Sequence, residues 1–490
     1  MKIKKLLEET EYELLQGNLD TEFSTLEYDS RKVQAGSVFV CIPGTTVDGH
    51  DFIPQVTEKG AAALVVTKDV EVDATITVIK VKDARKALAE LSAAYFDYPA
   101  RYLKTIGVTG TKGKTTTTYV VKSILEGAGI PCGLIGTIET IVGENKTPNP
   151  NTTPESYLVQ KYFRQMVDAG LKAVVMEVSS QALMMSRVAG ITFDIGVFTN
   201  LEPDHIGENE HKDFDDYMHC KSLLFRQCKV GIFNSDSEHL QGILEGHTCD
   251  ILTYGKSEGA DYRAVNEKLW SSAGALGVSY DITGKKNLSV EVNQPGEFSI
   301  YNSLCAVAIC DCFNVADDVI LSALKQITVK GRIEMIPVSD DFTLMIDYAH
   351  NAMALESLLT TLRAYNPNRL VCLFGCGGNR AKSRRYEMGE VSSKMCELTI
   401  VTSDNPRNEE PMDIIADILI GVKKADGEYV TIPDRKDAIK YAIEHGQKGD
   451  IIVLAGKGHE DYQEIKGVKH HMDERELIVD ILAELKDSVR

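Results

Sequence analysis

Short runs of apolar residues alternate with longer amphipathic stretches through most of this chain. The apolar runs lie at residues 105–109, 173–178, 195–199, 344–348, 370–374, 398–402 and 451–455. Stretches with helical periodicity lie between them, for example at 114–127 and 412–424. Strands that are apolar on both faces belong in parallel sheets covered by helices on both sides, so this alternation predicts an α/β fold.

The first part of the chain has a different pattern. It mixes short strands, such as those expected near 36–44 and 61–67, with turn residues. At 490 residues the chain is long enough for about three domains. We expect a small N-terminal α/β domain over residues 1–98, a central P-loop-type ATPase domain with a mainly parallel sheet over 99–330, and a C-terminal Rossmann-like α/β domain over 331–490.

Charge, hydropathy and cysteine spacing exclude several classes of protein. The net charge of −19 argues against nucleic acid as a partner, since binding it requires a basic face. No apolar run is long enough for a membrane span. Lys4 and Lys5 near the N-terminus are followed within a few residues by Glu8 and Glu9, so we expect no export signal and a cytoplasmic protein. The 11 cysteines include no C-x-x-C pair, which favours reduced thiols over a zinc site.

A glycine-rich segment joins the strand at 105–109 to the helix that follows. Its sequence is Gly110-Thr111-Lys112-Gly113-Lys114-Thr115-Thr116. Glycines let backbone N–H groups converge on phosphates, and the helix N-terminus adds partial positive charge. Val108 stands where a strict Walker A motif has its first glycine, yet the strand and helix context still predicts ATP binding. Lys114 would reach the terminal phosphates and Thr115 would offer its hydroxyl to Mg²⁺.

Polar residues also follow two of the other central strands. Glu177 directly follows the apolar residues 173–176, and His205 follows the run at 195–199. The carboxyl edge of an open α/β sheet is where ligands bind, and a carboxylate there could hold Mg²⁺. The alternatives, a solvated glutamate at a strand end and a structural histidine, remain open at this point.

The chain resembles the muramyl ligase family over its whole length. The motifs that carry this resemblance are the phosphate loop, Asp29-Ser30-Arg31, Asn151-Thr152-Thr153-Pro154, Glu177-Val178-Ser179-Ser180, Thr199-Asn200-Leu201, Asp204-His205, the segment from Tyr217 to Lys221, Gly331-Arg332, Asp347-Tyr348-Ala349-His350, Asp404-Asn405-Pro406-Arg407 and Gly456-Lys457-Gly458-His459-Glu460. Within the family, the N-terminal zone and the motifs at 151–154 and 404–407 favour members that add the third residue of a cell-wall peptide.

The resemblance implies an ATP-dependent amide ligase. A substrate carboxylate would take the γ-phosphate of ATP, and the amine of an amino acid would then attack the acyl phosphate. The implied catalytic residues are Lys114, Glu177, His205 and Lys221. Thr115, Glu177, His205 and a carbamylated Lys221 would hold Mg²⁺. Further ATP contacts would come from residues 110–116 and from Asn302, Arg332 and His350.

The resemblance also implies a UDP-linked muramyl dipeptide as substrate. Ser30, Thr45 and Thr46 would contact the uridine diphosphate in the N-terminal domain, although ordinary turn chemistry is the alternative for these hydroxyls. The muramyl-peptide contacts would be Asn151, Thr152, Thr153, Ser179 and Arg187. Relatives often have glutamine where this chain has Met185, which cannot donate the same hydrogen bond.

The amino acid implied is meso-2,6-diaminopimelate. Its contacts would be Arg380, Asp404, Asn405, Pro406, Arg407, Gly456 and Glu460. Arg407 would bind the distal carboxylate, unless it forms a structural ion pair with Glu409 or Glu410. Other possibilities are L-lysine as the amino acid, a folylpolyglutamate-type ligase and a non-catalytic ATP-binding protein. The N-terminal zone argues against the folate enzyme, and the complete set of motif residues argues against a non-catalytic protein. We expect a monomer that binds only small molecules.

Overall fold

A computed structural model of the chain describes residues 1–44, 47–204, 206–207, 210–272 and 274–488. It forms two compact units, Met1–Asp261 with Cys305–Ala316 and Tyr262–Leu304 with Asp317–Arg490. The predicted domain boundaries at 98/99 and 330/331 stay predictions. Within the described residues, no helix is both long and apolar enough to cross a membrane.

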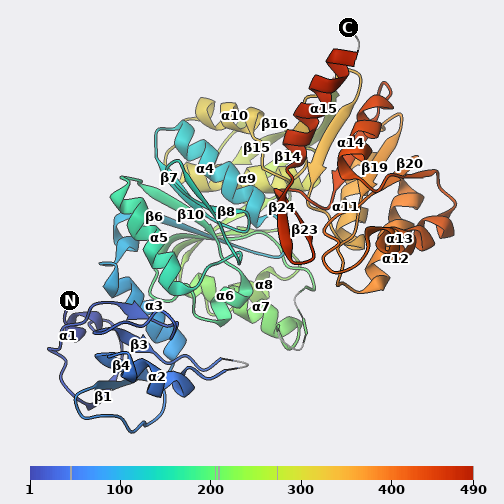
Figure 1. The fold of residues 1–490 in the computed structure, drawn as a ribbon. Helices are drawn as coiled ribbons and strands as arrows, with labels where there is room; N and C mark the ends of the chain where they lie inside the picture. Colours follow the sequence, from blue (N-terminus) through green and yellow to red (C-terminus); the bar gives the residue numbers. More distant parts are fainter. Residues whose placement is uncertain (45–46, 205, 208–209, 273, 489–490) are drawn as a thin grey trace. The chain divides into compact units, whose positions relative to one another are not determined.

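The N-terminal part of the first unit is a sheet with helices on both faces (Figure 1). Its elements are α1 (Ile3–Leu6), β1 (Glu13–Gln16), β2 (Leu26–Glu27), β3 (Val38–Val40), α2 (Ile53–Glu58), β4 (Ala63–Val66), β5 (Thr77–Lys80) and α3 (Ala84–Tyr95). The strand order is β1-β5-β4-β3-β2, and only the β1–β5 pair is antiparallel. The strands expected near 36–44 and 61–67 are β3 and β4.

The rest of the first unit is built on a larger sheet. Its strands are β6 (Lys104–Thr109), β7 (Cys132–Ile135), β8 (Glu139–Val142), β9 (Asn145–Pro148), β10 (Ala173–Glu177), β11 (Phe193–Phe198), β12 (Cys228–Asn234) and β13 (Asp250–Gly255). Its helices are α4 (Lys114–Gly127), α5 (Ser156–Asp168), α6 (Ser180–Met184), α7 (Phe214–Ser222) and α8 (Leu240–Leu244). The order is β13-β12-β11-β6-β10-β7-β8-β9, and the strands from β13 to β7 are parallel.

The second unit begins with an antiparallel meander in the order β16-β15-β14. Its members are β14 (Tyr262–Ser272), β15 (Ala275–Gly284) and β16 (Leu288–Val292). Two helices follow along the chain, α9 (Glu297–Asp311), which is divided between the units, and α10 (Asp317–Gln326). The meander was not predicted from the sequence.

The C-terminal part of the second unit contains a doubly covered sheet and a separate hairpin. Its strands are β17 (Glu334–Ile336), β18 (Thr343–Asp347), β19 (Leu370–Phe374), β20 (Leu398–Val401), β21 (Tyr429–Thr431) and β22 (Ile451–Ala455), with β23 (Tyr462–Ile465) and β24 (Val468–His471) in the hairpin. Its helices are α11 (Ala352–Arg363), α12 (Lys382–Met395), α13 (Pro411–Ala425), α14 (Arg435–Glu444) and α15 (Glu474–Ser488). The sheet order is β17-β18-β22-β19-β20-β21, parallel except for β17.

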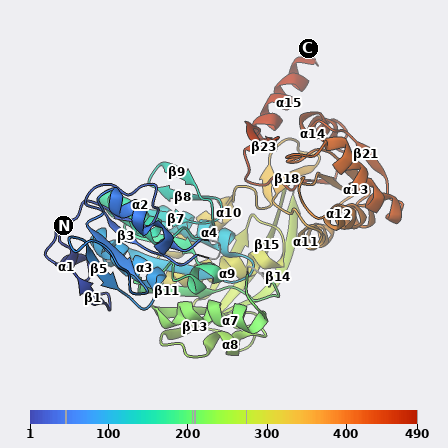
Figure 2. The same cartoon turned by 60° about the horizontal axis from the view of Figure 1, so that its bottom comes forward.

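Alternate residues of the C-terminal strands pack on opposite faces of that sheet. Cys372 and Phe374 join α11, α12 and α13 in one core, whereas Val371 and Leu373 join α14 and α15 in another. Figure 2 shows α12 and α13 on one side of the sheet and α14 on the other. The expected α/β fold, with parallel strands covered on both faces, is therefore confirmed.

Candidate active site

The predicted phosphate loop has the expected strand–loop–helix geometry. It follows β6 directly, and Gly113 is the N-cap of α4. Gly110 and Gly113 have φ values of 143° and 85°, which glycine adopts at little cost. A side chain at Gly110 would also collide with Thr199, which follows β11. The loop thus requires glycine at both positions, and the start of α4 carries the partial positive charge that attracts an anion.

The end of β11 holds the phosphate loop in place. The Thr199 hydroxyl donates to the Lys112 carbonyl at 2.7 Å, and the Asn200 side-chain oxygen accepts the Lys112 N–H at 2.8 Å. Lys114 folds back onto the loop, where its Nζ donates to the Gly110 carbonyl at 2.8 Å and the Thr111 carbonyl at 3.0 Å. The loop and its lysine are therefore preorganised.

Glu177 brings several oxygen atoms together beside the loop. Its carboxylate is 1% exposed at the end of β10, and it accepts the Thr115 hydroxyl at 3.1 Å. It also accepts the Thr137 N–H at 2.8 Å and the Thr137 hydroxyl at 3.0 Å. A carboxylate and two hydroxyls are the hard oxygen donors that Mg²⁺ prefers, so these residues fit that ion. His205, the other predicted ligand from a strand end, lies outside the described residues.

Lys221 is 2% exposed on α7 and points at the same loop. Its Nζ donates to the Gly110 carbonyl at 2.9 Å and lies 4.3 Å from the centre of the Tyr217 ring. Burial, and then the positive charge of Lys114, lower the pKa of Lys221 well below its ordinary value. The Tyr217 hydroxyl is 3.0 Å from that of Thr111. The structure therefore brings Lys114, Lys221 and the loop into one site.

The predicted muramyl-peptide contacts gather next to Glu177. The Thr153 hydroxyl donates to the Glu177 carbonyl at 2.8 Å and accepts the Ser179 N–H at 3.0 Å. Arg187 donates to the Thr153 carbonyl at 3.0 Å, and the hydroxyls of Thr152 and Thr137 are 3.1 Å apart. Asn151 lies beside them in the chain and is exposed. Of the predicted uridine contacts, Ser30 is buried with its carbonyl bound by Lys59, whereas Thr45 and Thr46 lie outside the described residues.

In the second unit, the predicted diaminopimelate contacts meet at the carboxyl ends of β20 and β22. Asn405 donates to the Glu460 carboxylate at 2.9 Å. The Asp404 carboxylate lies so close to Gly456 that a Cβ atom there would be 3.0 Å from it. The buried Lys457 ammonium donates to Asn405 at 2.9 Å and to Glu460 at 2.8 Å. Arg380, in the loop after β19, is exposed.

Arg407 forms an ion pair, but its partner is neither Glu409 nor Glu410. It lies 3.2 Å from the Glu464 carboxylate and donates to the Gly378 carbonyl at 2.7 Å. The Glu409 carboxylate instead accepts the buried Arg385 guanidinium at 2.7 Å. The alternative prediction, an ion pair between Arg407 and Glu409, is therefore wrong. Arg407 pairs instead with Glu464 of the β23–β24 hairpin.

Two of the three predicted nucleotide contacts of the second unit adjoin these residues, since the Asp347 carbonyl accepts the Gly456 N–H at 3.0 Å. Arg332 and His350 both flank Tyr348, at 5.0 Å and 4.7 Å from its ring centre. Asp347, next to them, is half-buried, and loss of solvation raises the pKa of its carboxyl. Asn302 is 7% exposed on α9. That these residues contact ATP stays a prediction.

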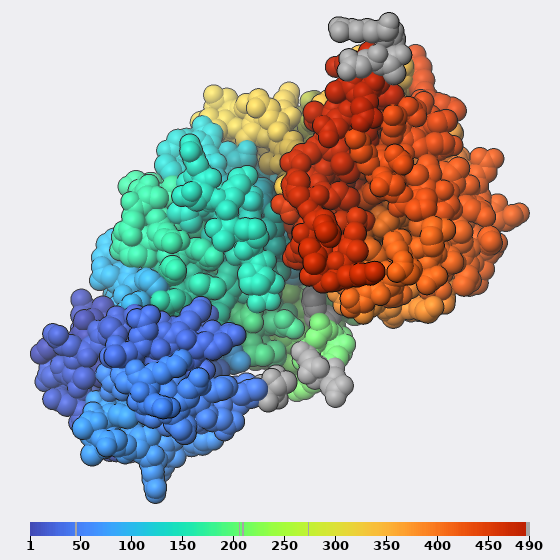
Figure 3. All heavy atoms as spheres, in the orientation of Figure 1, coloured from blue at the N-terminus to red at the C-terminus, as the bar shows by residue number. Residues whose placement is uncertain are grey.

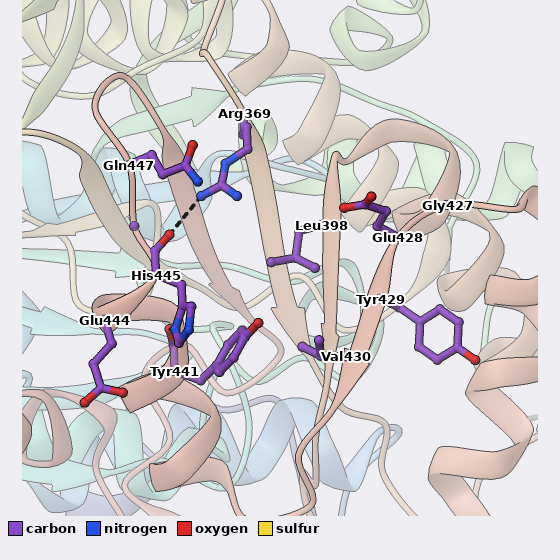
Figure 4. Close-up of a pocket in the computed structure, with 11 residues that line it drawn as sticks. Arg369, Leu398, Gly427, Glu428, Tyr429, Val430, Tyr441, Glu444, His445 and Gln447 are labelled. Carbon is purple, nitrogen blue, oxygen red and sulfur yellow. Dashed lines mark hydrogen bonds between the residues drawn. The ribbon is translucent and has the colours of Figure 1, made fainter.

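A pocket of 650 Å³ lies at the other edge of the C-terminal sheet (Figure 4). It is lined by Arg369, Leu398, Gly427, Glu428, Tyr429, Val430, Tyr441, Glu444, His445, Gly446 and Gln447. It lies at the amino ends of β19, β20 and β21, whereas open α/β sheets bind ligands at the carboxyl ends. None of the predicted site residues lines it, so we do not place the active site there.

Thr137 and His211 were missed from the sequence. Thr137 could have been found, because it follows the apolar run 132–135, whose parallel strand ends at the ligand-binding edge. His211 is fully buried, with its ring nitrogens 2.8 Å from the Ser180 hydroxyl and 3.2 Å from the Asp216 carboxylate.

Cys220 lies near His211 and Asp216 in a group that could hold a metal ion. Both ring nitrogens of His211 already have partners, and burial raises the pKa of the Cys220 thiol to about 11. We therefore interpret His211 as a hydrogen-bonded link between Ser180 of α6 and Asp216 of α7 rather than as part of a metal centre.

A phosphate loop with a buried carboxylate beside it, in a multidomain α/β chain, defines the class of nucleotide-dependent α/β enzymes. Models of the Mur ligase family, catalytic domain, the Mur ligase middle domain, and the Mur ligase, glutamate ligase domain match residues 22–96, 108–310 and 331–458. The chain belongs to the Mur ligase family, and the resemblance to muramyl ligases is confirmed.

Individual relatives match over the whole chain. The UDP-N-acetylmuramoyl-L-alanyl-D-glutamate--2,6-diaminopimelate ligase 1 of Clostridium acetobutylicum is 42% identical over 488 residues, covering 99% of this chain and 100% of that protein. The corresponding ligase of Clostridium perfringens is 42% identical over 489 residues, covering 98% and 99%. A solved structure of a ligase with this name is 27% identical, covers 99% of each chain and has a TM-score of 0.74.

Proposed function

We propose that this chain joins meso-2,6-diaminopimelate to UDP-N-acetylmuramoyl-L-alanyl-D-glutamate in an ATP- and Mg²⁺-dependent reaction of cytoplasmic peptidoglycan precursor synthesis. The observation that carries the proposal is its 42% identity, over 99% of its length, to a relative named for this reaction. The clustering of Lys114, Glu177 and Lys221 around the phosphate loop supports it.

In the proposed first step, the substrate carboxylate attacks the γ-phosphate of ATP, and ADP leaves. Lys114 and the N–H groups at the start of α4 stabilise negative charge on the phosphates. Thr115 and Glu177, together with His205, would hold Mg²⁺, which would neutralise part of the phosphate charge. Thr153, Ser179 and Arg187 orient the peptide.

Lys221 is proposed to act as a carbamate. Its low pKa provides the neutral amine, which adds to CO₂ with loss of one proton and becomes an anion. The modification would exchange a buried cation beside Lys114 for an anionic ligand that suits Mg²⁺. Burial of Lys221 and the family resemblance support this assignment.

In the second step, the amine of diaminopimelate attacks the acyl carbon, and phosphate leaves. Arg407, assisted by Arg380, binds the distal carboxylate, for which a planar guanidinium offers two parallel donors. Gly456 and Glu460 bind the distal amino group, and Asp404, Asn405 and Pro406 complete the diaminopimelate site. L-Lysine lacks the distal carboxylate, so it gains nothing from Arg407.

A competition assay tests the proposal. Purified protein is given ATP, Mg²⁺, the UDP-linked dipeptide and either diaminopimelate or L-lysine, and phosphate release is measured. We expect kcat/KM to favour diaminopimelate over L-lysine in the wild type, and by much less in Arg407→Ala. Equal kcat/KM values for the two amino acids in the wild type would defeat the proposal.

A further inference from the structure

The β23–β24 hairpin is fastened to the segment that carries Arg407. The Gln463 side chain donates to the Asp404 carbonyl at 2.7 Å, and the Glu464 N–H donates to the Asn405 side-chain oxygen at 2.9 Å. The Arg407 N–H donates to the Glu464 carbonyl at 2.9 Å, and its carbonyl accepts the Lys466 N–H at 2.7 Å. In Figure 3 the red C-terminal stretch that contains this hairpin lies at the surface.

The backbone of Arg407 adopts an uncommon conformation in this arrangement. Its φ is 53°, in the left-handed region that residues other than glycine seldom occupy. Such a conformation persists when the surrounding structure holds it, and the hydrogen bonds to the hairpin do so here. The hairpin therefore fixes the backbone from which the Arg407 side chain extends, and the Gly378 carbonyl accepts from its guanidinium at 2.7 Å.

The same hairpin supplies the counter-ion of Arg407. The Glu464 carboxylate lies 3.2 Å from Arg407 Nε, and the two side chains are 27% and 24% exposed. A pair that is in part hydrated is weak enough to be exchanged for another carboxylate. Glu460, by contrast, is bound by the fully buried Lys457 and by Asn405, so its charge is already balanced.

We infer that Glu464 is an internal counter-ion that the distal carboxylate of the amino acid must displace from Arg407, so that Glu464 sets both affinity and selectivity. This inference rests on the proposed role of Arg407. When diaminopimelate binds, its distal carboxylate replaces the Glu464 carboxylate at Arg407. The binding free energy therefore gains only the difference between these two ion pairs. L-Lysine has no distal carboxylate to displace Glu464, so it leaves the Arg407–Glu464 pair intact.

Glu464→Gln removes the competing charge and keeps the shape of the side chain. We expect KM for diaminopimelate to fall about two- to fivefold, the range of a partly exposed ion pair, with kcat and the KM for ATP unchanged. Lysine should become a poorer substrate, so that the diaminopimelate-to-lysine ratio of kcat/KM rises by about fivefold. Glu476→Gln, which changes an exposed carboxylate paired with His471 of the same hairpin, is the matched control and should alter neither value.

A double-mutant cycle separates this role from a purely structural one. In an Arg407→Ala background, Glu464→Gln should no longer change KM, since the pair no longer exists. An unchanged KM for diaminopimelate in Glu464→Gln would overturn the inference. A raised KM would overturn it as well, and would indicate that Glu464 accepts a hydrogen bond from the ammonium of the substrate. If wild-type protein does not use diaminopimelate, the proposed function itself fails, which is a different result.

Discussion

Lys221 places an ionisable amine where water is almost absent. An ordinary lysine would keep its charge by extending into solvent, but this side chain is held between the Gly110 carbonyl and the Tyr217 ring. Burial and the nearby Lys114 both disfavour the ammonium form. The neutral amine is the form of lysine that reacts with CO₂, so this environment favours that reaction.

Lys221→Ala is therefore expected to lose nearly all ligase activity and to regain part of it with added formate or acetate, because a small carboxylate can occupy the place of the carbamate. Activity is measured as phosphate release with the full substrate set. In wild-type protein incubated with ¹³C-bicarbonate, a carbamate carbon signal should appear in the NMR spectrum and be absent from the variant. A fully active wild-type enzyme without this signal would contradict the assignment.

At the scale of elements, local patterns predicted a large part of the fold. The runs 370–374 and 451–455 coincide with β19 and β22, and the helix expected at 114–127 coincides with α4. Strands apolar on both faces and a loop rich in glycine are specified by neighbouring residues, so the sequence reveals them directly. The rule that ligands bind at strand carboxyl ends likewise placed Thr115 beside Glu177.

Contacts between residues far apart in the chain could not be predicted in this way. Arg407 and Glu464 are 57 positions apart, and nothing in either segment indicates that the hairpin folds back onto the motif at 404–407. His211 likewise joins the start of α6 to α7 through Ser180 and Asp216. Such links depend on the tertiary arrangement, which local periodicity does not encode.

The His211 link leads to a prediction about stability. His211→Ala would leave the buried Ser180 hydroxyl and the Asp216 carboxylate without this partner and would open a cavity in the core. We expect the free energy of unfolding of the central domain to fall by about 2–4 kcal/mol, measured by urea denaturation. His219→Ala is the control, because this histidine is exposed on α7, the helix that His211 contacts through Asp216, and it should change stability little. Equal effects of the two substitutions would refute the structural role of His211.

At the scale of the whole molecule, the candidate chemistry is divided between the two compact units. The phosphate loop, Glu177 and Lys221 belong to the first unit, and the residues around Arg407 belong to the second. The proposed reaction also has two steps, of which only the second involves the amino acid. Substitutions in the phosphate loop and at Arg407 should therefore interrupt the reaction at different points.

Lys114→Ala and Arg407→Ala provide the comparison. Lys114→Ala should lower formation of the acyl phosphate by about a hundredfold or more, because it removes a cation from the charge that develops on the phosphates. Arg407→Ala should still form the acyl phosphate and lose mainly its transfer to diaminopimelate. The intermediate is measured without amino acid, by trapping it with hydroxylamine as the hydroxamate, and the peptide product is measured separately by chromatography. Because Arg407 contacts neither phosphate nor muramyl peptide in the proposed mechanism, loss of the hydroxamate in Arg407→Ala would show that the two steps are not divided between the units in this way.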